Sequence, residues 1–304
     1  MDWFVVTSAL SLAAMYGLLG IGISLTWSSI GMLNLAHGFT FAAAGYGAWW
    51  ASKNLVKAPT SGTDAVIVGG AGILIGAIAG LAVGLVAFLP LHDRPNFPIR
   101  SLIATLAISL AGTQVFLLWF GPLNKPLPKV FSPVARALDR PKLEFGPISI
   151  TWDRVGSIVC ATLLCVIVLT WVRLSRRGIQ MRAMMQNPEG AALVGVSVRS
   201  TGMLVMGICG GMAGLSAVLL SSTFFVNPSA GTQPLAKGLV IALLGGLGSV
   251  PGAVIASILV GFTEALTAKY FGTGTTLFAQ YVLVFGVLIV RPRGIGGLLA
   301  EVRE

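Results

Sequence analysis

The chain has 304 residues, of which 55% are apolar and only 10% carry a formal charge, whereas soluble domains carry about 25% charged residues. So few charges cannot cover a water-soluble surface, which excludes a soluble globular protein. The net charge of +10 would suit a nucleic-acid-binding protein, but in so apolar a chain we attribute it to basic loops beside anionic lipid head groups. We therefore expect membrane lipids, and no nucleic acid, as partners.

Seven stretches of the chain lack Asp, Glu, Lys and Arg, and each approaches or exceeds the about 17–25 residues that a membrane-spanning helix needs. They cover residues 3–52, 65–91, 101–124, 155–172, 201–236, 238–263 and 270–290. Strands of a membrane barrel would instead alternate apolar and polar residues over segments of about ten residues. Because a helix satisfies its own backbone in lipid, we predict an all-α polytopic membrane protein. We expect about eight membrane segments in two pseudo-repeated halves.

Two of these stretches contain segments that should interrupt a helix. In GMLNLAHG, residues 31–38, Asn34 and His37 lie between apolar and small residues, and LLGGLGSVPGAV, residues 243–254, combines glycines with a proline that cannot donate a hydrogen bond. We predict broken or re-entrant helices at both places. Irregular backbone at membrane depth must be buried in protein or line a cavity, so both segments are candidates for a translocation path.

Glycines recur every four residues in two of the predicted helices. The first helix contains Gly72, Gly76, Gly80 and Gly84, and the second contains Gly207, Gly210, Gly211 and Gly214. Small residues at this spacing let helix backbones approach closely in lipid. We expect both sets to lie at contacts between helices.

A single domain, residues 1–304, is predicted because neither half has a polar surface of its own. Its parts are a first half (about 1–120), an external loop (about 121–154), a second half (about 155–291), a cytoplasmic loop within it (about 174–200) and a cytoplasmic tail (292–304). The loop at 174–200 is dense in arginine, which indicates the cytoplasmic side. The loop at 121–154 is also basic, but the parity of the spans puts it outside.

The cytoplasmic loop contains the segment QNPEGAALVGV, which predicts a short helix. Asn187 is a favourable N-cap, Pro188 suits the first helical position, and Glu189 complements the positive end of the helix dipole. The small residues that follow would suit insertion into a groove on another protein. An amphipathic connector between two spans explains the same residues equally well.

Few groups in the apolar stretches could catalyse a reaction or move protons. The ionisable candidates are His37, Lys237 and Glu264, and we interpret Glu264 as forming an interfacial pair with the nearby Lys269. Paired carboxylates, a nucleophile beside a base and metal-ligand spacing are absent from the sequence, so we predict no catalytic or metal-binding residue. The three cysteines, Cys160, Cys165 and Cys209, are interpreted as packing residues.

The sequence also bears on the source of energy for transport. The motif GxxxxGK[ST] is absent, so ATP would have to be hydrolysed by another subunit. An ion-coupled carrier or channel is the alternative, and it would need Glu264 or His37 to titrate during transport.

Three segments resemble one family of proteins. The segment MRAMMQNPEGAALVGV is similar to the coupling loop of bacterial ABC importers and in particular to that of branched-chain amino acid permeases. GMLNLAHG resembles the motif after the first span of those permeases, in the LivH-like branch, and ALLGGLGSVPGAVIAS resembles their glycine-rich C-terminal segment. The chain departs from the family pattern at Phe39, where an acidic residue often follows the histidine-glycine pair.

This resemblance implies a non-catalytic permease subunit in the bacterial inner membrane. It would work with a second, LivM-like permease, two cytoplasmic ATPase subunits and a periplasmic solute-binding protein, and it would bind no cofactor itself because ATP is used by the ATPases. Branched-chain amino acids are the implied solutes, with urea, short amides and aromatic acids as alternatives. We expect weak solute selection in the permease.

The resemblance also assigns roles to residues of this chain. Those implied to couple the permease to its ATPase are Arg182, Asn187, Pro188, Glu189, Gly190, Ala191 and Gly195. Those implied to lie near the translocation path are Asn34, His37, Gly38, Gly245, Gly246 and Gly248.

Overall fold

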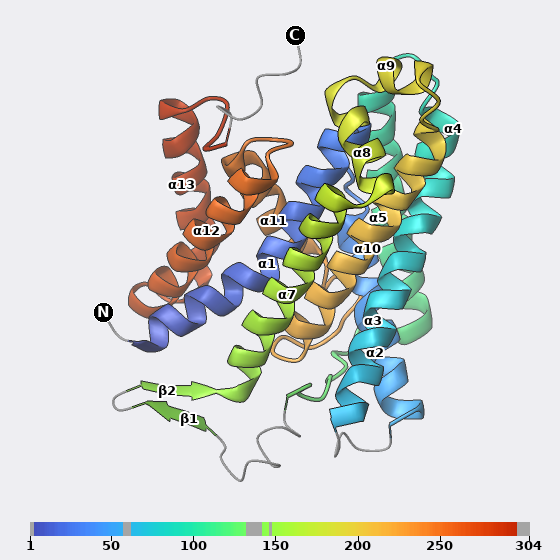
Figure 1. The fold of residues 1–304 in the computed structure, drawn as a ribbon. Helices are drawn as coiled ribbons and strands as arrows, with labels where there is room; N and C mark the ends of the chain where they lie inside the picture. Colours follow the sequence, from blue (N-terminus) through green and yellow to red (C-terminus); the bar gives the residue numbers. More distant parts are fainter. Residues whose placement is uncertain (1–2, 57–61, 132–141, 146–147, 297–304) are drawn as a thin grey trace.

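The computed structural model describes residues 3–56, 62–131, 142–145 and 148–296, and it forms a helical bundle with a β-hairpin at one end (Figure 1). The helices are α1 (Trp3–Ile30), α2 (His37–Asn54), α3 (Gly62–Val83), η1 (Gly84–Phe88), α4 (Leu89–Leu91), α5 (Phe97–Phe120), α7 (Trp152–Leu174), α8 (Arg176–Gln186), α9 (Pro188–Leu193), α10 (Val198–Ser221), α11 (Thr232–Gly245), α12 (Val250–Tyr270), η2 (Thr273–Thr275) and α13 (Thr276–Val290). The strands are β1 (Lys142–Phe145) and β2 (Ile148–Thr151).

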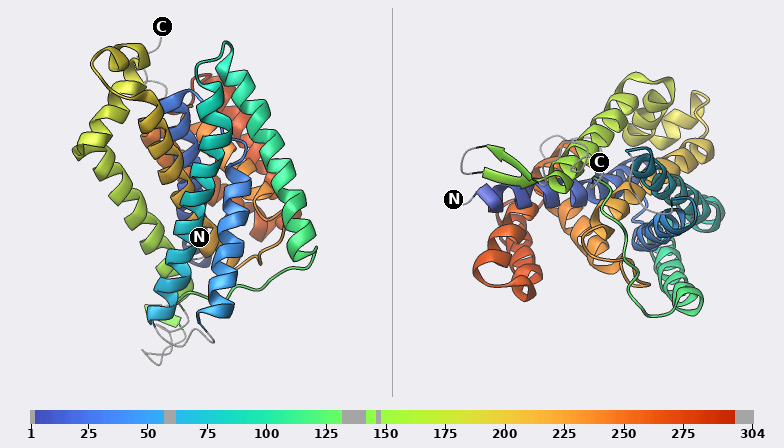
Figure 2. Two further views of the ribbon diagram at one scale, coloured as in Figure 1. Left: turned by 90° about the vertical axis from the view of Figure 1, so that its right-hand side faces the viewer. Right: turned by 90° about the horizontal axis from the view of Figure 1, so that it is seen from below.

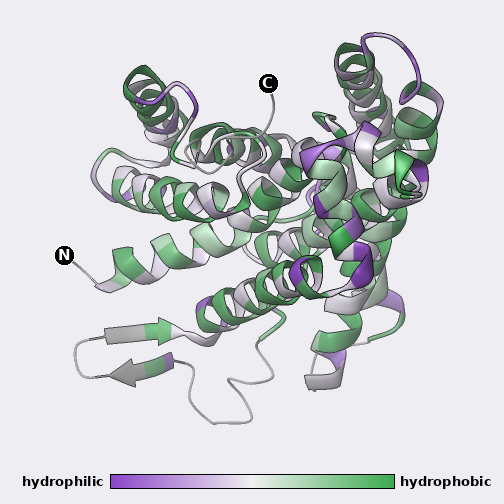
Figure 3. Ribbon diagram, turned by 45° about the horizontal axis from the view of Figure 1, so that its top comes forward, coloured by the Kyte–Doolittle hydropathy of each residue, from purple (hydrophilic) through white to green (hydrophobic). Residues whose placement is uncertain are grey.

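Within the described residues, seven helical segments are long and apolar enough to cross a membrane. They are Trp3–Ile30, Gly62–Leu91, Phe97–Phe120, Trp152–Leu174, Val198–Ser221, Val250–Tyr270 and Thr273–Val290. The apolar helix α11 is shorter, at 14 residues, and α2 has 18. These segments confirm the predicted all-α polytopic membrane protein. Figure 3 shows largely hydrophobic helices, with hydrophilic residues gathered on α8 and on the loops at the same end of the bundle.

The two ends of the bundle carry different connections. Helices α8 and α9 lie at one end, with the α4–α5 connection and the C-terminal end of α1, whereas the β-hairpin lies at the other end with the N-terminus (Figures 1 and 2). The parity of the spans predicted that the segment 121–154 would be separated from the arginine-rich loop, and the described residues of that segment are so placed.

Helices α1 and α10 form the centre of the bundle. Every side chain of α1 from Met15 to Thr26 is buried, and so is nearly all of the C-terminal half of α10. The two helices are also joined directly, because the Ser216 hydroxyl donates to the Met15 carbonyl at 2.8 Å. Helices α5, α7 and α13 lie at the periphery and leave large apolar side chains exposed, as expected for surfaces that meet lipid or another membrane protein.

The predicted glycine contacts join α3 to α10. A Cβ atom added at Gly76 would collide with the carbonyl oxygen of Gly210 and lie 2.8 Å from the Cα atom of Gly214. Gly80 faces the Met206 carbonyl in the same way, and Gly72 faces Val218. The backbones of the two helices therefore touch, which confirms the interpretation of the glycine spacing.

Helix α3 ends in the π-helical turn η1, which the sequence reading did not predict. The Leu89 N–H donates to the carbonyl of Gly84, five residues earlier, and Pro90 follows in α4. Pro90 has no N–H to donate to the carbonyl of the residue four positions before it. The regular series of α-helical hydrogen bonds therefore cannot continue through Pro90.

Two small β interactions lie at the end of the bundle opposite α9. Strands β1 and β2 are antiparallel, with Lys142 opposite Thr151, and an isolated bridge joins Lys125 to Val226. The bridge, with N–O distances of 2.7 and 2.9 Å, ties the segment after α5 to the segment after α10. A bridge between residues so far apart in the sequence has no local signal that could predict it.

We predict that Gly76→Ala destabilises the protein. The new methyl group meets backbone atoms of α10, which cannot rotate away, so the expected loss is about 1–3 kcal/mol, seen as a lower melting temperature of the purified protein in detergent. The control is Gly70→Ala in the same helix, where an added Cβ meets nothing within 4 Å. Alanine favours a helix over glycine, so the control should melt no lower than the natural protein; equal melting of both variants would contradict the proposed contact.

Candidate functional site

The first predicted break lies between α1 and α2, at residues 31–36, and one side chain of the break and one of α5 satisfy backbone groups in it. The Asn34 side-chain oxygen accepts from the Ala36 N–H at 3.0 Å, and the hydroxyl of Thr105, on α5, accepts from the Leu35 N–H at 3.1 Å. Asn34 and His37 are both buried. These bonds explain how an interrupted backbone is tolerated inside an apolar bundle.

His37 packs between helices and lines neither of the two cavities described below. Its Nε2 atom would lie 3.1 Å from a Cβ added at Gly22 of α1, and the same point of α1 is close to Cys209 of α10. Among the described residues, His37 Nε2 has no hydrogen-bond partner. The imidazole thus fills the space beside a glycine of α1.

Gly38 occupies a close contact between two helices that begin inside the bundle. A Cβ added to Gly38 would lie 2.9 Å from the carbonyl oxygen of Gly231, directly before α11. Gly38 and Gly231 both border a cavity of about 260 Å³ between α2, α5 and α11, where α5 contributes Ser109, Thr113 and Gln114. Of the six predicted path residues, Gly38 is the one that borders a described cavity.

The three remaining path candidates, Gly245, Gly246 and Gly248, form the turn between α11 and α12. Gly246 and Gly248 have φ angles of 88° and 92°, which other residues rarely adopt. The turn is tightly packed, because Ile295 N–H donates to the Leu244 carbonyl and Gly296 N–H donates to the Gly245 carbonyl, both at 2.9 Å. It also lies beside Trp27 and Ser28, near the end of α1. The helix break is therefore as predicted, but its glycines serve a compact turn.

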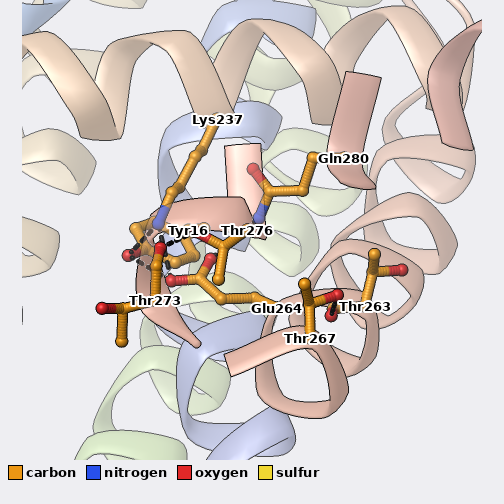
Figure 4. Close-up of polar contacts among 8 residues, drawn as sticks. All are labelled: Tyr16, Lys237, Thr263, Glu264, Thr267, Thr273, Thr276 and Gln280. Atoms are coloured by element: carbon orange, nitrogen blue, oxygen red, sulfur yellow. Dashed lines mark hydrogen bonds and ion pairs between the residues drawn. The ribbon is translucent and has the colours of Figure 1, made fainter. Parts of the chain in front are cut away.

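A larger cavity, of about 610 Å³, lies at the end of the bundle opposite α9. Its wall is made by α1, α2, α10, the segment after α10, α11, α12 and the start of α13. Lys237 of α11 and Glu264 of α12 line it, with 2.6 Å between Lys237 Nζ and Glu264 Oε1. Figure 4 shows Lys237 reaching toward Tyr16 and Glu264, with Gln280 on the other side of the carboxylate.

This pair corrects the interpretation of Glu264 as the interfacial partner of Lys269. The Glu264 carboxylate is buried and bonds Lys237, on a different helix, instead of its neighbour in sequence. The sequence did mark both residues as ionisable groups in or beside apolar stretches. It could not pair them, because they are 27 residues apart and nothing local indicates that α11 and α12 pack side by side.

The predicted short helix α9 begins as the sequence indicated. The Asn187 side chain accepts from the Gly190 N–H at 2.9 Å, and Pro188 takes the first helical position. Gly195, with φ of 87°, ends the segment. Asn187, Pro188 and Glu189 are exposed.

The remaining coupling candidates hold this segment in place. Ala191 is buried, and its carbonyl accepts from the Val196 N–H at 2.9 Å. Arg182 donates to the Arg173 carbonyl at 3.1 Å, which joins α8 to the end of α7. Two residues that the sequence reading overlooked, Leu193 and Val194, are 89% and 79% exposed at the tip.

An exposed ion pair lies beside α9. Arg199, in the first turn of α10, bonds Asp93 in the α4–α5 connection. The hydrogen bond from Arg199 holds the pKa of the Asp93 carboxyl below its ordinary value. The start of α10 is therefore linked both to α9 and to the connection that follows α3.

Comparison with known proteins identifies the family. The family described as "Branched-chain amino acid transport system / permease component" matches residues 5–291. The "High-affinity branched-chain amino acid transport system permease protein LivH" of Escherichia coli K12 is 29% identical over 294 residues, which covers 95% of this chain and 94% of the relative. The corresponding protein of Salmonella typhimurium is 28% identical with the same coverage, and BraD of Pseudomonas aeruginosa is 26% identical, also covering 95% and 94%. The resemblance seen in the sequence motifs is confirmed, and the chain belongs to the family of branched-chain amino acid transport system permease components.

Proposed function

We propose that this chain is the membrane-spanning permease subunit of a binding-protein-dependent ABC importer in the bacterial inner membrane. It forms half of a translocation path for branched-chain or related amino acids. The observation that carries the proposal is the exposed helix α9, whose apolar tip, Leu193 and Val194, lies at the arginine-rich end of the bundle. The chain lacks a nucleotide-binding motif, so a partner would have to hydrolyse ATP. The names of the relatives favour branched-chain amino acids over urea, short amides and aromatic acids.

The proposed assembly contains a second permease, two cytoplasmic ATPases and a periplasmic solute-binding protein. The chain itself is non-catalytic and holds no cofactor, and ATP acts on the partner subunits. Exposed apolar residues on the peripheral helix α5, such as Ile103, Leu110 and Leu118, offer a face for the second permease.

Helix α9 is built to transmit a push from an ATPase into the bundle. Its own residue Ala191 is buried against the bundle, and α9 is joined to α8 through the hydrogen bond from Asn187 N–H to the Ala183 carbonyl, at 3.0 Å. Four residues separate the end of α9 from the start of α10, and α10 touches α3 through backbone atoms. A movement of α9 would therefore be passed on to α10 and, through the backbone contact, from α10 to α3.

The assembled importer should take up L-leucine into liposomes only when ATP and the loaded binding protein are both present. The chain alone, with an imposed proton or sodium gradient, should give no uptake, because the transport energy comes from the ATPases. Radiolabelled L-leucine measures both reactions. Gradient-driven uptake by the chain alone would instead support the ion-coupled alternative.

We expect Glu189→Lys to abolish stimulation of the ATPase by the loaded binding protein while the complex still assembles in the membrane. The substitution reverses the charge at the exposed start of α9, where a negative side chain also complements the helix dipole. ATP hydrolysis by the purified complex is the measurement. The matched control is Ser200→Lys, an exposed position on α10 at the same end, which should keep its stimulation. Full stimulation of Glu189→Lys would rule out this coupling role.

Replacing both tip residues, Leu193→Asn with Val194→Asn, should weaken binding of the ATPase by about tenfold or more. Burying a leucine or valine side chain at an interface contributes about 1.5–3 kcal/mol, which the asparagines would lose. Both side chains are exposed in the permease, so the permease itself should stay equally stable. The affinity of the detergent-purified permease for its ATPase measures the effect. Leu123→Asn, an exposed position near the opposite end, is the control. Unchanged affinity in the double variant would show that the tip is not the docking surface.

A further inference from the structure

The cavity of about 610 Å³ combines an apolar wall with a buried charged pair. Its apolar lining includes Leu12, Phe41, Leu220, Phe224 and Pro234, and its polar lining includes Asn227, Ser229, Thr232, Gln233, Thr273 and Thr276. This volume lies within the range of about 300–1,000 Å³ typical of small-molecule sites. A mainly apolar wall with a few converging polar groups is also typical of such sites.

The charged pair is held by a network from four helices. Lys237 Nζ donates to Glu264 Oε1 at 2.6 Å and to the Tyr16 hydroxyl at 2.9 Å, and Gln280 Nε2 donates to Glu264 Oε2 at 2.9 Å. Tyr16 lies on α1 and Gln280 on α13 (Figure 4). The described residues use two of the three donors of the ammonium group, so one is left for a molecule in the cavity.

A purely structural role explains this pair poorly. Removing two charges from water is costly, and well-packed apolar residues in place of a buried ion pair are often as stable or more stable. Ionisable side chains within membrane segments generally mark the route of a substrate or ion. Here Lys237 and Glu264 are only 5% and 8% exposed, yet both border the cavity instead of being sealed inside the packing.

We propose that this cavity binds a free α-amino acid with an apolar side chain, in its zwitterionic form. The solute carboxylate is bound by Lys237 and its ammonium group by Glu264, while the side chain lies against the apolar wall. This inference rests on the proposed function and adds a binding site within the permease itself. It departs from the expectation of weak solute selection in this subunit.

Charge balance supports this solute class. The pair has no net charge, and neither has a zwitterion, so binding brings no uncompensated charge into the membrane. Each solute charge meets the opposite charge of the protein. Helix α11 also begins at the cavity, at Thr232 and Gln233, and the positive end of its dipole favours a carboxylate. A solute with only one charge would add a net charge to this neutral pair inside the membrane.

The location fits delivery from the periplasmic side. The cavity is bordered by the C-terminal end of α10 and by the start of α13, both at the end of the bundle opposite α9. With α9 facing the ATPase, this is the end at which a binding protein would release its solute.

The test measures binding of radiolabelled L-leucine, L-valine and L-phenylalanine to the purified full-length chain in lipid nanodiscs. The natural chain should bind at least one of them, and competition by 4-methylpentanoate or 3-methylbutylamine, which each keep one charge of leucine, should be weaker than competition by leucine by about tenfold or more. Lys237→Met and Glu264→Gln should each weaken binding by a similar factor.

A single substitution leaves the other charge buried without a partner and could prevent folding. The double variant Lys237→Met with Glu264→Gln avoids this, so it should stay folded, judged by its melting temperature and gel-filtration profile, and should lose binding. Lys269→Met, on the same helix as Glu264, removes a lysine that does not line the cavity and should bind normally.

Three results would overturn the proposal: absence of binding by the natural chain, undiminished binding by the folded double variant, or equal competition by the singly charged analogues. Uptake by the assembled importer separates this failure from a failure of the proposed function. If ATP-driven leucine uptake is intact both in the natural importer and in the double variant, the chain is an importer subunit without this binding site. If the natural importer gives no such uptake with any of the three amino acids, the proposed function itself fails.

Discussion

Helices in lipid gain little by hiding apolar side chains from one another, because the surrounding acyl chains are equally apolar. This bundle therefore depends on backbone contact, and the contact between α3 and α10 is its clearest instance. Gly76 and Gly80 of α3 lie against carbonyl groups of α10, and Gly210 and Gly214 return the contact. One helix lies in each of the two predicted halves of the chain, so this contact would join them.

Helix α10 connects the two ends of the molecule at which we propose function. It starts beside α9, and its last residues, Leu220 and Ser221, border the larger cavity. At 1.5 Å per residue its 24 residues span about 36 Å. The docking surface and the solute site are thus linked by one helix, which is almost entirely buried over its C-terminal half and hydrogen-bonded to the central helix α1 through Ser216.

Local sequence signals predicted local structure well. The break before His37, the N-cap at Asn187 and the turn after Gly245 each follow from the preferences of a few adjacent residues. The glycine spacing predicted which helix faces touch. The ion pair of Lys237 and Glu264 and the bridge from Lys125 to Val226 depend on residues that only tertiary packing brings together, and no periodicity encodes them. The hairpin pairs neighbouring segments of the chain, but it was not among the predictions. The roles of the predicted path and coupling residues stay predictions.

The contact between Gly38 and Gly231 has an electrostatic consequence for the barrier that a permease must maintain. Helices α2 and α11 both begin at this point and leave it toward opposite ends of the bundle. Two positive helix-dipole ends are thereby focused on one spot within the bundle. Such a spot repels protons and metal cations, as paired half-helices do in water channels. In the proposed importer, this arrangement would oppose leakage of cations along the translocation path, whereas a solute without net charge would not be repelled.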